Sequence, residues 1–145
     1  MAEATIRNVG ACVFDAYGTI FDFNAATASC RDALGDNAAP LSAAWRDKQL
    51  QYTWLRSLMG RHADFWQVTG EALDYAMDSL GLDDAELRDR LLNCYLQLDA
   101  FEEVPETLER LKSGGLKTAI LSNGSPDMLA AAVRGAGIGD LLDAV

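Results

Sequence analysis

The amino-acid sequence predicts an α/β fold built on a parallel sheet, and three observations lead to this prediction. Residues 9–14 form a short apolar run that stops at Asp15, which is typical of a buried strand. Helical periodicity then continues for about eighty residues after Asp22. A helix, a Gly-Gly turn and a second apolar run at residues 116–121 follow, which is the order of a right-handed parallel crossover.

Composition and charge limit the class of protein. The chain has 145 residues, of which 50% are hydrophobic, so it can bury the core of one domain with at most a small inserted unit. Its formal net charge of -10 argues against nucleic acid and anionic membrane surfaces as partners, because binding to either needs a basic footprint. An anionic substrate would need a local positive site to overcome this charge.

The cysteines and the hydrophobic pattern predict a cytoplasmic protein. Cys12, Cys30 and Cys94 are odd in number and their spacing matches no metal-binding knuckle, so we expect buried free thiols in a reducing compartment. Residues 1–10 lack the basic and apolar regions of a secretion signal. No apolar run approaches the roughly 18 residues that a membrane helix requires, so we expect no membrane contact.

Asp15 is the candidate nucleophile. It lies at the C-terminal end of the first predicted strand, and Gly18 and Thr19 give the following loop a turn. Ligands of open parallel sheets bind outside these strand ends, which places the carboxylate where chemistry is possible. The alternative is that Asp15 only caps the turn, as Asp often does after a strand.

Four helices are predicted between the two strands, over residues 24–34, 40–59, 64–80 and a segment that carries residues 87–98. Gly35 closes the first helix, and a loop at residues 36–40 follows it. Asp64 is the expected N-cap of the third helix, and Asp83 with Glu86 forms a capping box before the fourth.

Arg46 is the one cation that we single out in the second helix. It lies four residues before Leu50 and eight before Trp54, so on a helix these three side chains form one row. Arg46 therefore lies on an apolar row and not on the solvated face. One interpretation is that its stem is buried and its guanidinium reaches water. The other is that it binds an anion, for which the fixed charge and forked donors of arginine are suited.

The second strand brings polar residues to the same sheet edge as Asp15. Pro105 begins a helix, Gly114 and Gly115 end it, and the strand at residues 116–121 leads into Ser122 and Asn123. Because parallel neighbours end at one edge, we expect Ser122 and Asn123 to lie near Asp15. The alternative is that Ser-Asn-Gly is only a turn. A final helix begins at Ser125-Pro126 and closes at Gly137.

Three stretches resemble the L-2-haloacid dehalogenases of the haloacid dehalogenase superfamily. They are DAYGT followed by IFD at residues 15–22, AWRDKQLQYTWLRSLM at residues 44–59 and LKTAILSNGSP at residues 116–126. Most members of the superfamily are phosphatases with an acidic residue two positions after the nucleophile. Here that residue is Tyr17, a poor proton donor because its ordinary pKa is near ~10.

The resemblance implies a Rossmann-like parallel-sheet core, residues 1–22 and 103–145, with an inserted helical cap, residues 23–102. It implies hydrolytic dehalogenation of short L-2-haloacids to D-2-hydroxy acids through an ester on Asp15, buttressed by Thr19. The substrate and the halide would be bound by Ala16, Tyr17, Arg46, Phe65, Ser122 and Asn123. No metal and no cofactor is implied, and a homodimer is expected, with Trp45, Tyr52 and Leu55 as either its surface or ordinary cap core.

The resemblance also implies residues that this sequence does not supply. Members of the family continue for several strands and contribute a lysine and a Ser/Asn/Asp cluster that support ester hydrolysis. We therefore expect that the 145 residues are part of a longer enzyme and that residues 138–145 approach a further strand. The alternatives are a Mg-dependent phosphatase, against which Tyr17 argues, and a non-catalytic fragment that serves in dimerisation.

Overall fold

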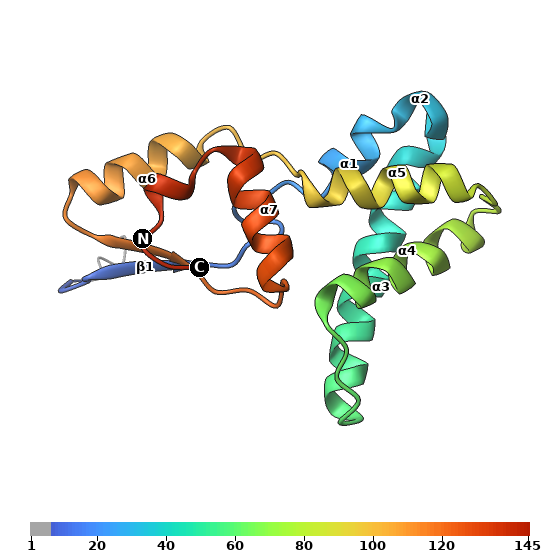
Figure 1. Ribbon diagram of the computed structural model, residues 1–145, viewed down its shortest axis with the longest axis horizontal. Helices are drawn as coiled ribbons and strands as arrows, with labels where there is room; N and C mark the ends of the chain where they lie inside the picture. Colours follow the sequence, from blue (N-terminus) through green and yellow to red (C-terminus); the bar gives the residue numbers. More distant parts are fainter. Residues whose placement is uncertain (1–6) are drawn as a thin grey trace, which may run out of the picture.

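The computed structural model describes residues 7–145 of the chain. Residues 1–6, which belong to the first predicted core segment and to the segment examined for a secretion signal, lie outside the described residues. The elements follow in the order β1 (Ala11–Phe14), α1 (Ala25–Ser29), α2 (Arg31–Leu34), η1 (Gly35–Asn37), α3 (Ala38–Leu58), α4 (Phe65–Ser79), α5 (Ala85–Leu96), α6 (Val104–Ser113), β2 (Lys117–Ile120), α7 (Pro126–Ala136) and η2 (Gly139–Leu141). Figure 1 shows β1, β2, α6 and α7 in one group and α1 to α5 in another.

The two strands form the predicted parallel pair. The register aligns Ala11 with Lys117 and Phe14 with Ile120, and the Leu121 amide donates to the Phe14 carbonyl oxygen at 2.8 Å. Both strands therefore end at one edge, so the residues that follow them are neighbours. Beyond β2, Ala144 forms a parallel bridge with Ala119, which agrees with the expected approach of residues 138–145 to a further strand.

The prediction that the first strand is buried is wrong within the described residues. Residues of β1 alternate between exposed and half-buried, and Val13 is 60% exposed. The reason is visible in Figure 1, where α6 and α7 lie on the same side of the sheet. Thr118 and Ile120 of β2 are buried on the covered side, so the pattern is that of a sheet with one covered face.

Helix capping confirms several predicted boundaries and corrects one. The Asp64 side chain accepts a hydrogen bond from the Gln67 amide at 2.9 Å, and Ser125 accepts one from the Met128 amide at 3.4 Å. The predicted cap at Asp83 is wrong by one residue, because Asp84 has the extended backbone of an N-cap and accepts from the Leu87 amide at 2.9 Å.

The first predicted helix is divided in two, and the predicted loop after it is absent from the described residues. Cys30 separates α1 from α2, and its amide donates to Thr27 O at 3.2 Å in a tightened turn. Gly35, which has a φ of 54°, begins the short helix η1, and η1 leads directly into α3. Pro40 is compatible with this earlier start because the first helical turn needs no amide donor there.

The longest helix, α3, packs along α4 and ends in an exposed apolar segment. Trp45 is buried and its indole Nε1 donates to the Thr69 carbonyl oxygen at 2.9 Å. The last turns of α3 expose Trp54, Leu55, Leu58 and Met59. Within residues 7–145, none of the helices has the length and hydropathy needed to cross a membrane.

Two connecting segments lie side by side between the strand group and the helix group. The Asp22 amide donates to the Asp99 carbonyl oxygen at 3.0 Å, and the Phe101 amide donates to the Ile20 carbonyl oxygen at 3.0 Å. Phe21 and Ala100 form an antiparallel bridge between them. This pairing holds the loop after β1 close to the end of α5.

Candidate active site

The residues after β1 form a compact turn that presents Asp15 at the sheet edge. The amides of Ile20 and Phe21 donate to the Ala16 carbonyl oxygen at 2.9 and 3.0 Å, and Gly18 has a φ of 97°. Ala16 and Tyr17 are buried, whereas Asp15 and Thr19 are exposed. Among the described residues, the amides of Ala16 and Tyr17 donate no hydrogen bond to this turn.

Tyr17 joins the strand ends to the helices. Its ring stacks on Tyr95 of α5 with centroids 5.5 Å apart and lies 5.6 Å from the ring of Phe65, the first residue of α4. Burial, then Tyr95, then the Asp15 carboxylate raise the pKa of Tyr17 above its usual value. Tyr17 therefore stays protonated at neutral pH and is a weak acid for protonating a leaving group.

Arg46 reaches from α3 to the turn after β1. Its Nη2 donates to the Tyr17 carbonyl oxygen at 2.8 Å, and its Cζ lies 5.0 Å from the centroid of the Phe23 ring. The side chain is half-buried, so the guanidinium is held against the protein and does not extend freely into water. The guanidinium thus contacts the protein as well as water, and its anion-binding role stays a prediction.

Ser122 and Asn123 follow β2 at the sheet edge that also carries Asp15. The Ser122 hydroxyl oxygen accepts from the Gly124 amide at 3.1 Å, which leaves its proton available for another acceptor. Gly124 itself lies against Tyr17, since a Cβ there would be 3.0 Å from the Tyr17 Cε2 atom. The turn predicted from Ser-Asn-Gly therefore exists. In its hydrogen bond the Ser122 hydroxyl is the acceptor, so the turn does not use the hydroxyl proton.

Asn123 and Phe65 line the same small cavity. The cavity has a volume of about 80 Å³ and lies between the end of α3, the start of α4 and the loop after β2, with His62 and Val68 among its other lining residues. The predicted site residues thus lie in the turn after β1, in the loop after β2, at Arg46 within α3 and at Phe65, the first residue of α4. Arg46 lines a separate small hollow with Phe23 and Tyr95, not the cavity of Asn123 and Phe65.

Two further residues, Gln49 and Tyr95, lie in this region although the sequence did not single them out as site candidates. Gln49 is buried and accepts from Arg46 Nη1 at 2.9 Å, and its Nε2 donates to the Tyr95 hydroxyl oxygen at 3.0 Å. Burial raises the pKa of Tyr95 to about 12. The available signal was the position of Gln49, a polar residue four after Trp45 on the buried side of α3.

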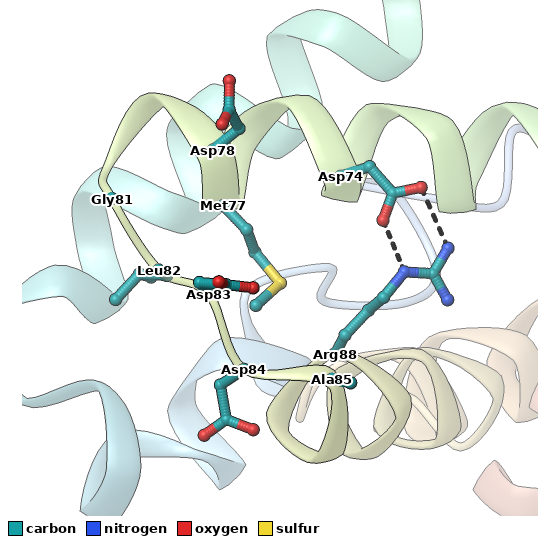
Figure 2. A pocket seen from close by; sticks show the side chains of 9 residues that line it. All are labelled: Asp74, Met77, Asp78, Gly81, Leu82, Asp83, Asp84, Ala85 and Arg88. Atoms are coloured by element: carbon teal, nitrogen blue, oxygen red, sulfur yellow. Dashed lines mark hydrogen bonds and ion pairs between the residues drawn. The ribbon is translucent and has the colours of Figure 1, made fainter.

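A larger hollow lies away from the strand ends. Figure 2 shows it between α4 and α5, with Arg88 paired to Asp74 and other acidic side chains around the rim. The Arg88 Nη2 donates to Asp74 Oδ2 at 3.0 Å. No group of three or more potential metal ligands occurs among residues 7–145, so we assign this acidic rim no metal site.

Comparisons with known proteins show the family of the chain. A family model described as haloacid dehalogenase-like hydrolase matches residues 9–145. The (S)-2-haloacid dehalogenase 1 of Pseudomonas sp. (strain CBS-3) is 48% identical over 136 residues, which are 93% of this chain and 60% of that protein. The (S)-2-haloacid dehalogenase of Pseudomonas sp. (strain YL) is 50% identical over 131 residues, 90% of this chain and 56% of that protein.

Solved structures give the same result. The L-2-haloacid dehalogenase of Xanthobacter autotrophicus with chloropropionic acid covalently bound superposes with a TM-score of 0.85 at 44% identity, covering 94% of this chain and 56% of that chain. The curated relatives named above are thus matched over only 56–60% of their own length. Because the family model covers nearly all of the described residues, the chain belongs to the haloacid dehalogenase-like hydrolases.

Proposed function

We propose that this protein is an (S)-2-haloacid dehalogenase, which hydrolyses short L-2-haloacids to D-2-hydroxy acids with inversion. The single observation that carries the proposal is the Arg46 guanidinium held over the turn that presents Asp15, with Tyr17 two residues after the carboxylate. The relatives named (S)-2-haloacid dehalogenase support the substrate class. Because the chain matches only part of their length, the activity is proposed for the protein to which this chain belongs.

The proposed reaction has two steps. The Asp15 carboxylate oxygen forms a bond to the second carbon of the haloacid while the carbon–halogen bond breaks and the halide leaves with the bonding electrons. Arg46 and Asn123 stabilise the charge that develops on the halide. Water then attacks the ester carbonyl, which releases the hydroxy acid and a proton and restores the Asp15 carboxylate.

The remaining site residues would orient the substrate. The free amides of Ala16 and Tyr17 and the hydroxyl proton of Ser122 are suited to hold the substrate carboxylate. Thr19, in the same turn, would buttress Asp15. Phe65 would contact the apolar part of the substrate, which agrees with its position on the cavity that Asn123 also lines.

The weak acidity of Tyr17 separates this proposal from the phosphatase alternative. Phosphatases of the superfamily protonate an alcohol leaving group with a carboxylic acid at that position, and a phenol with a raised pKa cannot replace it efficiently. A halide leaves as a stable anion and needs no proton, so the same tyrosine does not hinder dehalogenation. The chemistry as proposed uses no metal and no cofactor.

We also propose a core at residues 1–22 and 103–145, a cap at residues 23–102, a cytoplasmic location and a homodimer. The paired connecting segments at residues 20–22 and 99–101 support the boundaries. The three free cysteines support a reducing compartment.

Leu55 and the exposed residues around it support the dimer, whereas Trp45 is buried and belongs to the core. The dimer is tested by the mass of the chain in solution.

The first test is the formation of an ester on Asp15. The chain is incubated with L-2-chloropropionate, its intact mass is measured and free chloride is followed. We expect a mass increase of one propionate unit and chloride release, both lost in Asp15→Asn but kept in Asp36→Asn, an exposed aspartate of η1. D-2-chloropropionate should give neither product.

The outcomes separate the alternatives. An ester that accumulates without repeated chloride release would place ester hydrolysis on residues outside this chain. Equal labelling of the parent and Asp15→Asn would mean that Asp15 is not the nucleophile. Chloride release that Asp15→Asn leaves unchanged would contradict the proposal as a whole.

A further inference from the structure

Gln49 is a buried polar residue whose hydrogen bonds converge on the candidate active site. It is 1% exposed and contacts three elements. Its Oε1 accepts from Arg46 Nη1 at 2.9 Å, and its Nε2 donates to Thr69 Oγ1 at 2.7 Å and to the Tyr95 hydroxyl oxygen at 3.0 Å. A buried amide with this many partners has one orientation and one location.

The partners also fix which end of the amide faces Arg46. A guanidinium only donates hydrogen bonds, so it must face the amide oxygen. The Thr69 hydroxyl gives its proton to the Phe65 carbonyl oxygen at 2.6 Å, so its oxygen must accept from the amide nitrogen. Gln49 therefore links Arg46 of α3 to Thr69 of α4 and to Tyr95 of α5, whose hydroxyl is also within donating distance of Gln49 Oε1, at 3.3 Å.

The Arg46 guanidinium is consequently held at two points. Gln49 fixes Nη1 and the Tyr17 carbonyl oxygen fixes Nη2, while the Phe23 ring covers one face of the guanidinium. Rotation about the last bonds of the side chain would break at least one of these contacts. Nη1 and Nη2 are the two terminal nitrogens of the guanidinium, so both hydrogen bonds are needed to fix the plane of that group.

We infer that Gln49 is the positioning residue that fixes the Arg46 guanidinium for binding the departing halide. The inference rests on the proposed function for the role of the halide, and on the hydrogen bonds above for the positioning. A neutral amide is suited to this task because it accepts from Arg46 without cancelling its charge. A glutamate would hold the same nitrogen but form an ion pair, which would reduce the charge available to the halide.

The experiment compares Gln49→Met and Gln49→Glu with Gln51→Met, a matched glutamine-to-methionine control on the exposed side of α3. Rotation of the Arg46 Nη groups is followed by ¹⁵N NMR, and ester formation by intact mass with L-2-chloropropionate and L-2-bromopropionate. Gln49→Met should free the rotation and slow ester formation roughly 10- to 100-fold. Gln49→Glu should keep the rotation restricted and still slow ester formation. Gln51→Met should match the parent in both measurements.

A double variant distinguishes positioning from general destabilisation. In an Arg46→Ala background, Gln49→Met should slow ester formation by less than about 3-fold, because both substitutions remove the same interaction. Fully additive losses, or unchanged Arg46 rotation in Gln49→Met, would overturn the inference. If Gln49→Met does not fold, Gln49→Glu is the test. Free rotation of the Arg46 Nη groups in Gln49→Glu, or a rate of ester formation equal to that of the parent, would overturn the inference. If the parent restricts Arg46 through Gln49 but forms no ester, the positioning stands and the proposed ester formation fails for this chain.

Discussion

At the scale of single residues, Tyr17 is the contact through which the strand ends and the helices meet. Its ring lies against Tyr95 and Phe65, its carbonyl oxygen accepts from Arg46, and Gly124 leaves room for its edge. Arg46 contacts the backbone of Tyr17, and the ring of the same residue packs on α4 and α5. Packing around Tyr17 is where small changes of volume should have functional effects.

Gly124→Ala tests this packing. The added methyl group would lie 3.0 Å from Tyr17 Cε2 and 3.0 Å from Leu129 Cδ2, so one of the two side chains must move. We expect a loss of roughly 1–3 kcal/mol in the free energy of unfolding and slower ester formation. Urea unfolding and the ester assay measure these effects.

Gly10→Ala is the matched control, because a Cβ at Gly10 meets nothing within 4 Å. It should change neither the unfolding midpoint nor the rate of ester formation. A Gly124→Ala protein with the stability and rate of the parent would show that Tyr17 has freedom to move at this edge.

The sequence was sufficient to predict which residues gather at the sheet edge, but not how they are held. Asp15 and Ser122 follow from the ends of two apolar runs, because parallel strands end together. The position of Gln49 on the buried side of α3 indicated a buried polar residue, but its partners could not be predicted, since Tyr95 and Thr69 lie 46 and 20 residues away in sequence. Long-range side-chain partners leave no periodic signal in one sequence.

At the scale of elements, the sequence predicted where helices begin better than it predicted whether a helix is continuous. The caps at Asp64 and Ser125 depend only on neighbouring residues, and both were predicted correctly. The break at Cys30 was missed because α1 and the buried Cys30 pack against α5, which local propensity does not record. The burial of β1 was predicted wrongly because an apolar run does not show how many faces of the sheet are covered.

The segment after η2 is attached to β2 through Asp143, and this attachment should depend on pH. The Thr118 amide and the Lys117 ammonium group both donate to the Asp143 carboxylate, at 3.0 and 2.9 Å. These contacts, the backbone hydrogen bond first, lower the pKa of Asp143 to about 2. Because the folded state favours the ionised form, its contribution to stability is full above about pH 4 and is lost as the pH falls toward 2.

Hydrogen exchange measures this attachment. The Ile120 amide donates to the Ala144 carbonyl oxygen at 3.1 Å, so its protection factor should fall between pH 4 and pH 2 as Asp143 is protonated. Asp143→Asn should lower the protection at pH 6 and flatten the pH dependence, whereas Asp140→Asn in η2 should not. A protection factor that is constant over this pH range in the parent would contradict the assignment.

At the scale of the whole molecule, the net charge and the candidate site act in opposite directions on an anionic substrate. The chain carries a formal net charge of -10, which repels a small anion at long range. Arg46 lies close to the turn that carries Asp15, so the favourable field is local. Added salt screens long-range repulsion more than it screens a contact between partly buried groups. Salt should therefore weaken the repulsion by the net charge more than it weakens a contact with Arg46.

The exposed end of α3 provides the last prediction, the self-association of the chain. Leu58 is 85% exposed, and Trp54, Leu55 and Met59 beside it are also exposed, which forms an apolar patch suited to an interface. We expect light scattering to give twice the mass of one chain for the parent and one chain for Leu58→Glu. The uncovered sheet face, where Val13 and Leu121 are exposed, is the competing surface. If Val13→Glu gives one chain and Leu58→Glu does not, the sheet face forms the interface and the proposed α3 dimer is wrong.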